Sequence, residues 1–175
     1  MKRAFVVALA LMIFTSVPSL SQTSRKTPKK STSSSTSFEE KRQAEIRSGR
    51  QQIATQIKAL TQFLFLYGNI SKGIETAEQV NRYQEQTSVG MPPERIAQSK
   101  AKLKETIKTV RTELDKLENS FRLNPVLQTY YPNLAGVGKL GQAAEAQAAA
   151  NTFDQSGRSL IAAVNKLADA LVVLR

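Results

Sequence analysis

The sequence contains no cysteine, no histidine and no tryptophan among its 175 residues. Without cysteine there can be no disulfide, thiolate metal site or cysteine nucleophile, and without histidine there can be no imidazole ligand or Ser-His-Asp triad. Aromatic residues are also scarce, with 7 Phe and 4 Tyr. We therefore expect a protein without metal or cofactor that is not an enzyme, and whose fold is held by packing alone.

The N-terminus, residues 1–21, has the pattern of a secretory signal peptide. Lys2 and Arg3 precede an apolar stretch over residues 4–17, and small residues follow at Ser19 and Ser21. This order predicts cleavage after Ser21 and a periplasmic or extracellular location. The apolar stretch is shorter than the roughly 20 residues that cross a bilayer, so cleavage is favoured over the alternative, an uncleaved segment that tethers the protein.

Residues 22–37 are predicted to form a disordered basic linker. From Thr23 to Ser37, 10 of 15 residues are Ser or Thr, four are Lys or Arg, and none is apolar. Such a segment buries too little surface to offset the entropy of ordering it. It is either a solvated spacer or a basic arm for an anionic partner.

The remainder, residues 38–175, is predicted to be one all-α domain, because apolar residues recur at helical spacing and no strand pattern occurs. The predicted helices span residues 38–86, 92–121 and 139–174. A capping box from Ser37 to Glu40 marks the first start, and paired prolines suit the second. We expect an antiparallel three-helix bundle with a long first helix.

The apolar series of each helix defines the expected core. The second helix has an a/d pattern typical of coiled-coil packing. Its members are Ile96, Leu103, Ile107, Val110, Leu114, Leu117 and Phe121. The first helix contributes Ile46, Ile53, Ile57, Leu60 and Leu64, continuing through Ile70, Ile74, Ala77 and Val80. The third contributes Leu160, Val164, Leu167, Leu171 and Leu174.

Five consecutive bulky residues from Phe63 to Tyr67, which include Phe65, cover the whole circumference of the first helix. A single bundle seam cannot bury them all. Either the connection over residues 122–138 folds back onto them through its own aromatic residues, which we favour, or they form an exposed partner site.

The segment from Gly136 to Gly141 matches G-x-G-x-x-G at the start of a predicted helix. A dinucleotide site also needs a preceding strand in a βαβ unit, and none is predicted, so we interpret the glycines as a flexible helix entry. The free N–H groups there, beside Lys139, could still hold an anion. Two further glycines, Gly49 and Gly157, lie in similar heptapeptides and are interpreted as points of close helix approach.

The net charge is +11, of which +5 belongs to Ser37–Arg175. Four basic residues of the second helix fall within about 80° of arc, beside its apolar seam. They are Lys100, Lys104, Lys108 and Arg111. This stripe is either a polyanion-binding surface or, as we favour, one side of interhelical charge matching that would place Glu85 opposite Arg95, Glu78 opposite Lys102 and Glu75 opposite the neighbours of Glu105.

Two functions remain open. The first is an exported, non-catalytic helical interaction or structural protein. The second is a module that binds anionic envelope material, either lipid headgroups or cell-wall polymer, through the linker and the basic stripe. Self-association through Phe63 and Phe65 is a further option. Nucleic acid is not expected as a partner, because no aromatic residues are interleaved with the basic ones.

Overall fold

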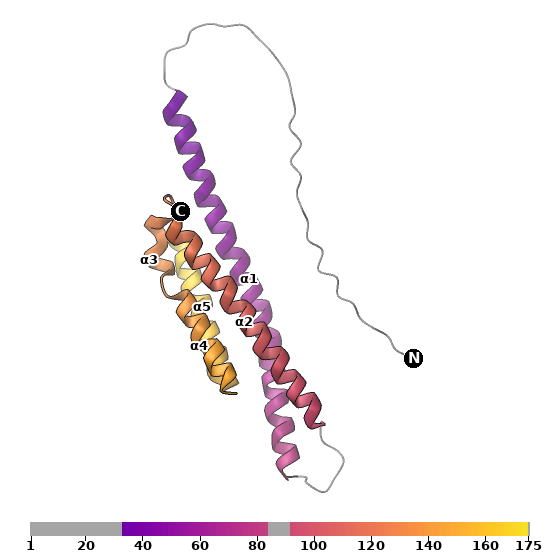
Figure 1. Ribbon diagram of the computed structural model, residues 1–175. Helices are drawn as coiled ribbons and strands as arrows, with labels where there is room; N and C mark the ends of the chain where they lie inside the picture. Colours follow the sequence, from indigo (N-terminus) through magenta and orange to yellow (C-terminus); the bar gives the residue numbers. More distant parts are fainter. Residues whose placement is uncertain (1–32, 84–91, 175) are drawn as a thin grey trace. The chain divides into compact units, whose positions relative to one another are not determined.

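The computed structural model describes residues 33–83 and 92–174. The predicted signal peptide, the linker up to residue 32 and the turn at 84–91 lie outside these ranges. Every element in the described part is helical, which confirms the all-α prediction (Figure 1). The elements are α1 (Ser33–Tyr83), α2 (Pro93–Leu123), the short 3-10 helix η1 (Gln128–Tyr130), α3 (Tyr131–Leu134), α4 (Val137–Ala149) and α5 (Phe153–Val173).

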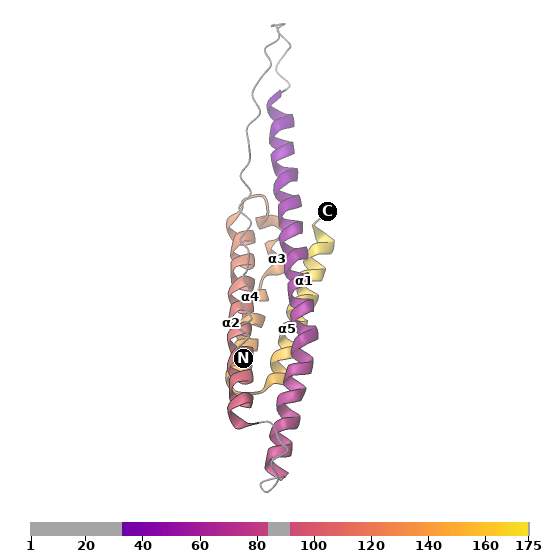
Figure 2. The same ribbon diagram turned by 90° about the vertical axis from the view of Figure 1, so that its right-hand side faces the viewer.

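The four long helices form a bundle in which α1 packs on α2 and α5, and α4 packs on the same two helices. Figures 1 and 2 show α1 and α4 running in one direction and α2 and α5 in the other. Each long helix therefore has antiparallel neighbours, the arrangement expected of helices joined by short connections.

The predicted third helix over residues 139–174 is wrong, and with it the three-helix count. The chain reverses after Ala149, and Asn151 adopts a left-handed conformation with φ 61°. The Thr152 N–H and Oγ1 both donate to the Gln147 carbonyl at 2.9 Å, which closes the turn. Asparagine is among the few residues that tolerate this backbone region, and no glycine or proline marked the break in the sequence.

The predicted boundaries of the first two helices differ from the structure by a few residues. α1 begins at Ser33, so residues 33–37 belong to the helix and not to a linker, and Ser37 is not its cap. Serine and threonine cost only a few tenths of a kcal/mol each inside a helix, which a well-packed helix absorbs. α2 begins at Pro93 and ends at Leu123, close to the predicted range.

The predicted core of α2 is confirmed, since six of its seven seam residues are buried and Val110 is half-buried. In α1 the buried line repeats every seven residues through Ile46, Ile53, Leu60, Tyr67 and Ile74. Tyr67 was not assigned to this seam from the sequence, and Ile70, which was, is 43% exposed.

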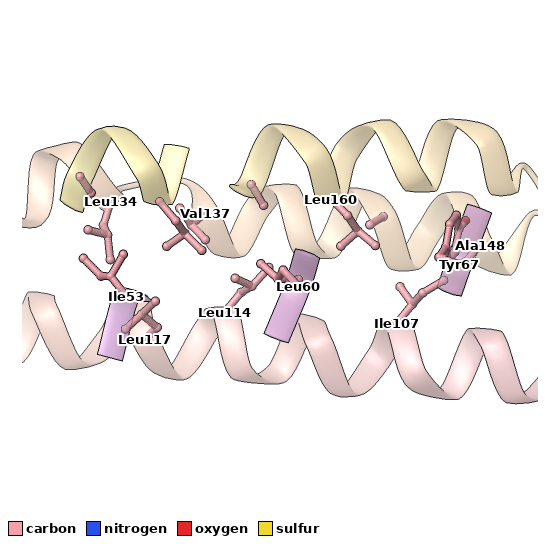
Figure 3. Close-up of a cluster of buried hydrophobic side chains, with 14 of the residues drawn as sticks. Ile53, Leu60, Tyr67, Ile107, Leu114, Leu117, Leu134, Val137, Ala148 and Leu160 are labelled. Carbon is pink, nitrogen blue, oxygen red and sulfur yellow. The ribbon is translucent and has the colours of Figure 1, made fainter. Parts of the chain in front are cut away.

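Buried side chains from all four long helices and α3 meet in successive layers (Figure 3). Ile53 of α1 lies near Leu134 of α3 and Val137 of α4, whereas Tyr67 lies near Ile107 of α2 and Ala148 of α4. Full burial of one such aliphatic side chain stabilises the fold by about 1.5–3 kcal/mol.

The connection after α2 packs on a different part of α1 than we expected. Leu127 is buried, and a Cβ on Gly49 would lie only 2.9 Å from the Leu127 Cδ2. Gly49 precedes Phe63 by 14 residues, or about 21 Å along the helix. The prediction that this connection covers Phe63 and Leu66 is therefore wrong.

Candidate functional site

The basic stripe of α2 is largely engaged within the bundle. Lys100 pairs with Glu78 of α1. The sequence had predicted Lys102, two residues further along α2, as the partner of Glu78. The Lys104 Nζ donates to the Ala149 carbonyl at the C-terminus of α4 at 3.2 Å, where the helix dipole favours a cation.

The remaining two members of the stripe differ from each other. The Arg111 Nε lies 2.8 Å from Asp115 Oδ2 and 3.8 Å from Glu145 Oε2 of α4. Lys108 is exposed and has no ion-pair partner among the described residues. Three of the four cations of the stripe thus face carboxylates or a carbonyl of this chain, which leaves Lys108 as the member of the stripe without such a contact among the described residues.

The N-terminus of α4, at the G-x-G-x-x-G segment, is occupied by a carboxylate of the chain itself. Glu118 of α2 accepts the Gly136 N–H at 2.9 Å and the Gly138 N–H at 2.6 Å. These are the free donors that we expected to be open to an external anion. The prediction of an open anion site is therefore wrong, because the side chain of Glu118 fills it.

The glycines of this segment have structural roles. Gly136 has φ 95°, a left-handed conformation that side chains rarely adopt. A Cβ on Gly138 would lie 2.3 Å from the Asp115 Oδ1 and would displace that carboxylate, and a Cβ on Gly141 would lie 3.1 Å from the Arg111 Cα of α2. The motif therefore serves packing between α2 and α4.

The bulky segment of α1 divides into buried and exposed members. Tyr67 is 4% exposed, and its Oη donates to the Phe153 carbonyl at the start of α5 at 2.5 Å. Phe63 is half-buried and stacks at a tilt on Tyr67, with ring centroids 5.5 Å apart. Phe65 and Leu66 point outward and are 75% and 57% exposed.

Tyr67 is the group with a perturbed titration in the described part of the chain. Burial raises the pKa of its phenol above the ordinary value of 10.0, and the nearby carboxylates of Asp154 and Glu75 add to the shift. The phenol is therefore a neutral hydrogen-bond donor at physiological pH, which fits a structural role in holding α5 against α1.

A second basic surface, which we did not identify from the sequence, lies on α1. We call it the α1 outer face, and it comprises the exposed residues Arg47, Arg50, Lys58, Phe65, Leu66 and Lys72. No Asp or Glu occurs between Ile46 and Ile74. This absence of acidic residues was readable in the sequence and could have indicated the surface.

A polar groove of 510 Å³ separates α1 from α2 on one side of the bundle. Its lining is Ser48, Gln51, Gln52, Thr55, Gln56, Glu113, Lys116, Leu117 and Ser120. Its two charged groups, Glu113 and Lys116, pair with each other at 2.8 Å. The groove therefore offers amides and hydroxyls for hydrogen bonding.

Within residues 33–83 and 92–174, no three Asp or Glu side chains group together as a metal site requires. None of the helices in these ranges combines the length and hydropathy needed to cross a bilayer. Comparison with known protein families gave no match, and comparisons with curated proteins and with solved structures gave none either.

Proposed function

We propose that this chain is an exported, non-catalytic helical interaction protein that acts through the outer surface of α1. The observation that carries the proposal is the exposure of Phe65 and Leu66 on a helix whose opposite side is fully packed. Bulky residues that are exposed next to one another are typical of a partner surface. Val172 and Val173 at the end of α5 form a second exposed pair, with smaller side chains. The absence of cysteine and histidine from the sequence favours binding over catalysis.

The second candidate function is binding of anionic envelope material. The structure favours the α1 outer face for this role over the basic stripe of α2. The four cations of the α1 outer face are exposed and form no ion pairs with described residues, unlike Lys100 and Arg111 of α2. An anionic partner would therefore meet α1 in preference to the α2 stripe.

A photo-crosslinking residue at position 65, introduced into the full chain in the cells that produce it, tests the interaction role. The matched control carries the same residue at position 123, because Phe65 and Leu123 are both 75% exposed. We expect adducts from position 65 and far fewer from position 123. Equal yields at the two positions, or none at position 65, would contradict the proposal.

The variant Phe65→Asp provides an independent check. Because the side chain is mostly solvent-exposed, we expect the melting temperature to stay within the small range typical of surface substitutions. Self-association or partner capture should be lost. Light scattering and a thermal melt on the same sample separate a binding defect from a folding defect.

A further inference from the structure

We propose that the α1 outer face docks on an anionic phospholipid bilayer, lying along its surface without crossing it. This inference rests on the interaction role proposed above and names its partner. The face combines exposed cations with exposed bulky apolar side chains, which is the composition of interfacial helices that lie on anionic membranes.

The positions of three residues carry the geometric part of the argument. Lys58, Phe65 and Lys72 follow one another at intervals of seven residues, the same interval as the buried line through Leu60 and Tyr67. At 100° per residue the two lines lie about 200° apart, so Lys58, Phe65 and Lys72 occupy the side of α1 opposite the core. Phe65 is thus flanked along the outermost line by two cations.

The charge of the surrounding surface is favourable. Over the 29 residues from Ile46 to Ile74, α1 carries four cations and no carboxylate. At the neighbouring groove between α1 and α5, Lys72 shares the lining with Glu75, while Asp154 is already paired with Arg158 at 2.9 Å. An approaching layer of phosphate groups would therefore meet uncompensated positive charge at Arg47, Arg50 and Lys58.

The apolar residues decide between a bilayer and a soluble polyanion. A polyanion needs only cations, whereas Phe65 and Leu66 gain free energy only if they leave water. The boundary between headgroups and acyl chains accepts an aromatic ring while the neighbouring lysines stay at the phosphates. Between Phe65 and Lys72, a span of about two helical turns, α1 supplies both apolar side chains and a cation.

Co-sedimentation with vesicles tests the inference. The chain from Gln22 is used, because the apolar N-terminal stretch would enter vesicles by itself, and because residues 33–175 form a compact unit with its own core. Vesicles of phosphatidylglycerol mixed with phosphatidylcholine are compared with vesicles of phosphatidylcholine alone. We expect binding only to the former, weakened as salt rises from about 0.1 M to about 1 M.

Two matched variant pairs locate the surface. Lys58→Gln with Lys72→Gln should lower the partition onto anionic vesicles by about tenfold or more, since each cation near such a surface contributes. Lys108→Gln with Lys139→Gln changes the charge equally on α2 and α4 and should have a much smaller effect. Phe65→Ser should weaken binding, whereas Leu123→Ser, at the same exposure, should not.

Equal binding to neutral and anionic vesicles, or equal losses in the α1 variants and their controls, would overturn the inference. So would retention by isolated peptidoglycan or a soluble polyanion without any vesicle binding. A protein adduct from position 65 in the crosslinking experiment, combined with no vesicle binding, would overturn the lipid partner and leave the interaction role standing. The two proposals therefore fail separately.

Discussion

At the scale of single residues, two side chains join helices that are distant in the sequence. Tyr67 of α1 donates to the first carbonyl of α5, 86 residues later in the chain. Glu118 of α2 accepts two N–H groups at the start of α4. Glu118 satisfies N–H groups at a helix start, which have no intrahelical partner, whereas Tyr67 adds a second donor to a carbonyl that α5 already uses.

Replacement of Tyr67 by phenylalanine should lower the free energy of unfolding by about 1 kcal/mol, the net value of one hydrogen bond. Since burial raises the phenol pKa above 10.0, the folded state retains the proton that the unfolded state releases. The contribution of this group is therefore present below about pH 10 and is lost as the pH rises through the folded pKa.

Chemical denaturation of wild type and Tyr67→Phe across neutral and alkaline pH measures this effect. The difference between the two proteins should be constant up to about pH 10 and narrow above it. A difference that grows with alkaline pH would contradict the assignment of Tyr67 as a neutral buried donor.

Replacement of Glu118 by alanine should destabilise the fold by about 1–3 kcal/mol, because the Gly136 and Gly138 N–H groups lose their acceptor. Glu113→Ala is the matched control, since that exposed carboxylate only pairs with Lys116, and it should cost about 0–1 kcal/mol. Urea titrations of both variants give the comparison. Equal costs would show that Glu118 does not cap α4.

At the scale of elements, the register of α2 and the reversal before α5 determine which faces are buried. Leu114 has no exposed surface, whereas Lys108 on the same helix is exposed. Asn151 makes the left-handed turn that separates α4 from α5. Each of these features has a direct test.

Leu114→Ala should lower the free energy of unfolding by about 2–5 kcal/mol, because it removes a buried side chain and leaves a cavity. Lys108→Ala should change it by about 0.5 kcal/mol or less. Thermal melts followed by circular dichroism distinguish the two. Similar losses in both variants would mean that the register of α2 is wrong.

Asn151→Ala should destabilise by about 1 kcal/mol, since alanine tolerates φ 61° poorly, while Asn151→Gly should be neutral or stabilising. Asn165→Ala offers a control of opposite sign, because this exposed residue lies inside α5, where alanine is the better helix former. Denaturant midpoints of the three variants test the reversal. A continuous helix through residue 151 would make Asn151→Ala stabilising.

At the scale of the whole described unit, the core is a series of layers, and the connection after α2 closes one end of it. Leu127 lies on Gly49, whereas Tyr67 is covered by Phe153 and Gly157 at the start of α5. Two segments therefore pack on α1 at separate positions: the connection after α2 at Gly49, and the start of α5 at Tyr67.

This separation predicts that Phe63 and Tyr130 are energetically independent. The substitutions Phe63→Ala and Tyr130→Ala should each destabilise, and the double variant should lose the sum within about 0.5 kcal/mol. A control pair, Phe121→Leu with Leu127→Ala, should couple, because both side chains approach Gly49. Double-mutant cycles by chemical denaturation measure the coupling free energy of each pair. Coupling between Phe63 and Tyr130 would contradict the conclusion that the two side chains pack at separate positions.

The sequence by itself determined the helical class and the seam of α2, and it indicated that Gly49 and Gly157 are crowded positions. These follow from local spacing, since a repeat of 3.6 residues fixes which side chains share a face. The lack of cysteine and histidine likewise limited the chemistry of any site. The absence of Asp and Glu between Ile46 and Ile74 is also a feature of the local sequence, so the basic surface of α1 could have been predicted from it.

Only the tertiary structure decided what each face meets. The reversal at Asn151 left no local mark, because the apolar spacing continues on both sides of it and asparagine is unremarkable in sequence. The α2 stripe became an internal network because Glu78 and Glu145 come from distant helices. Partners far apart in the chain are set by packing, so the sequence alone could not show that three of the four stripe cations are engaged within the bundle.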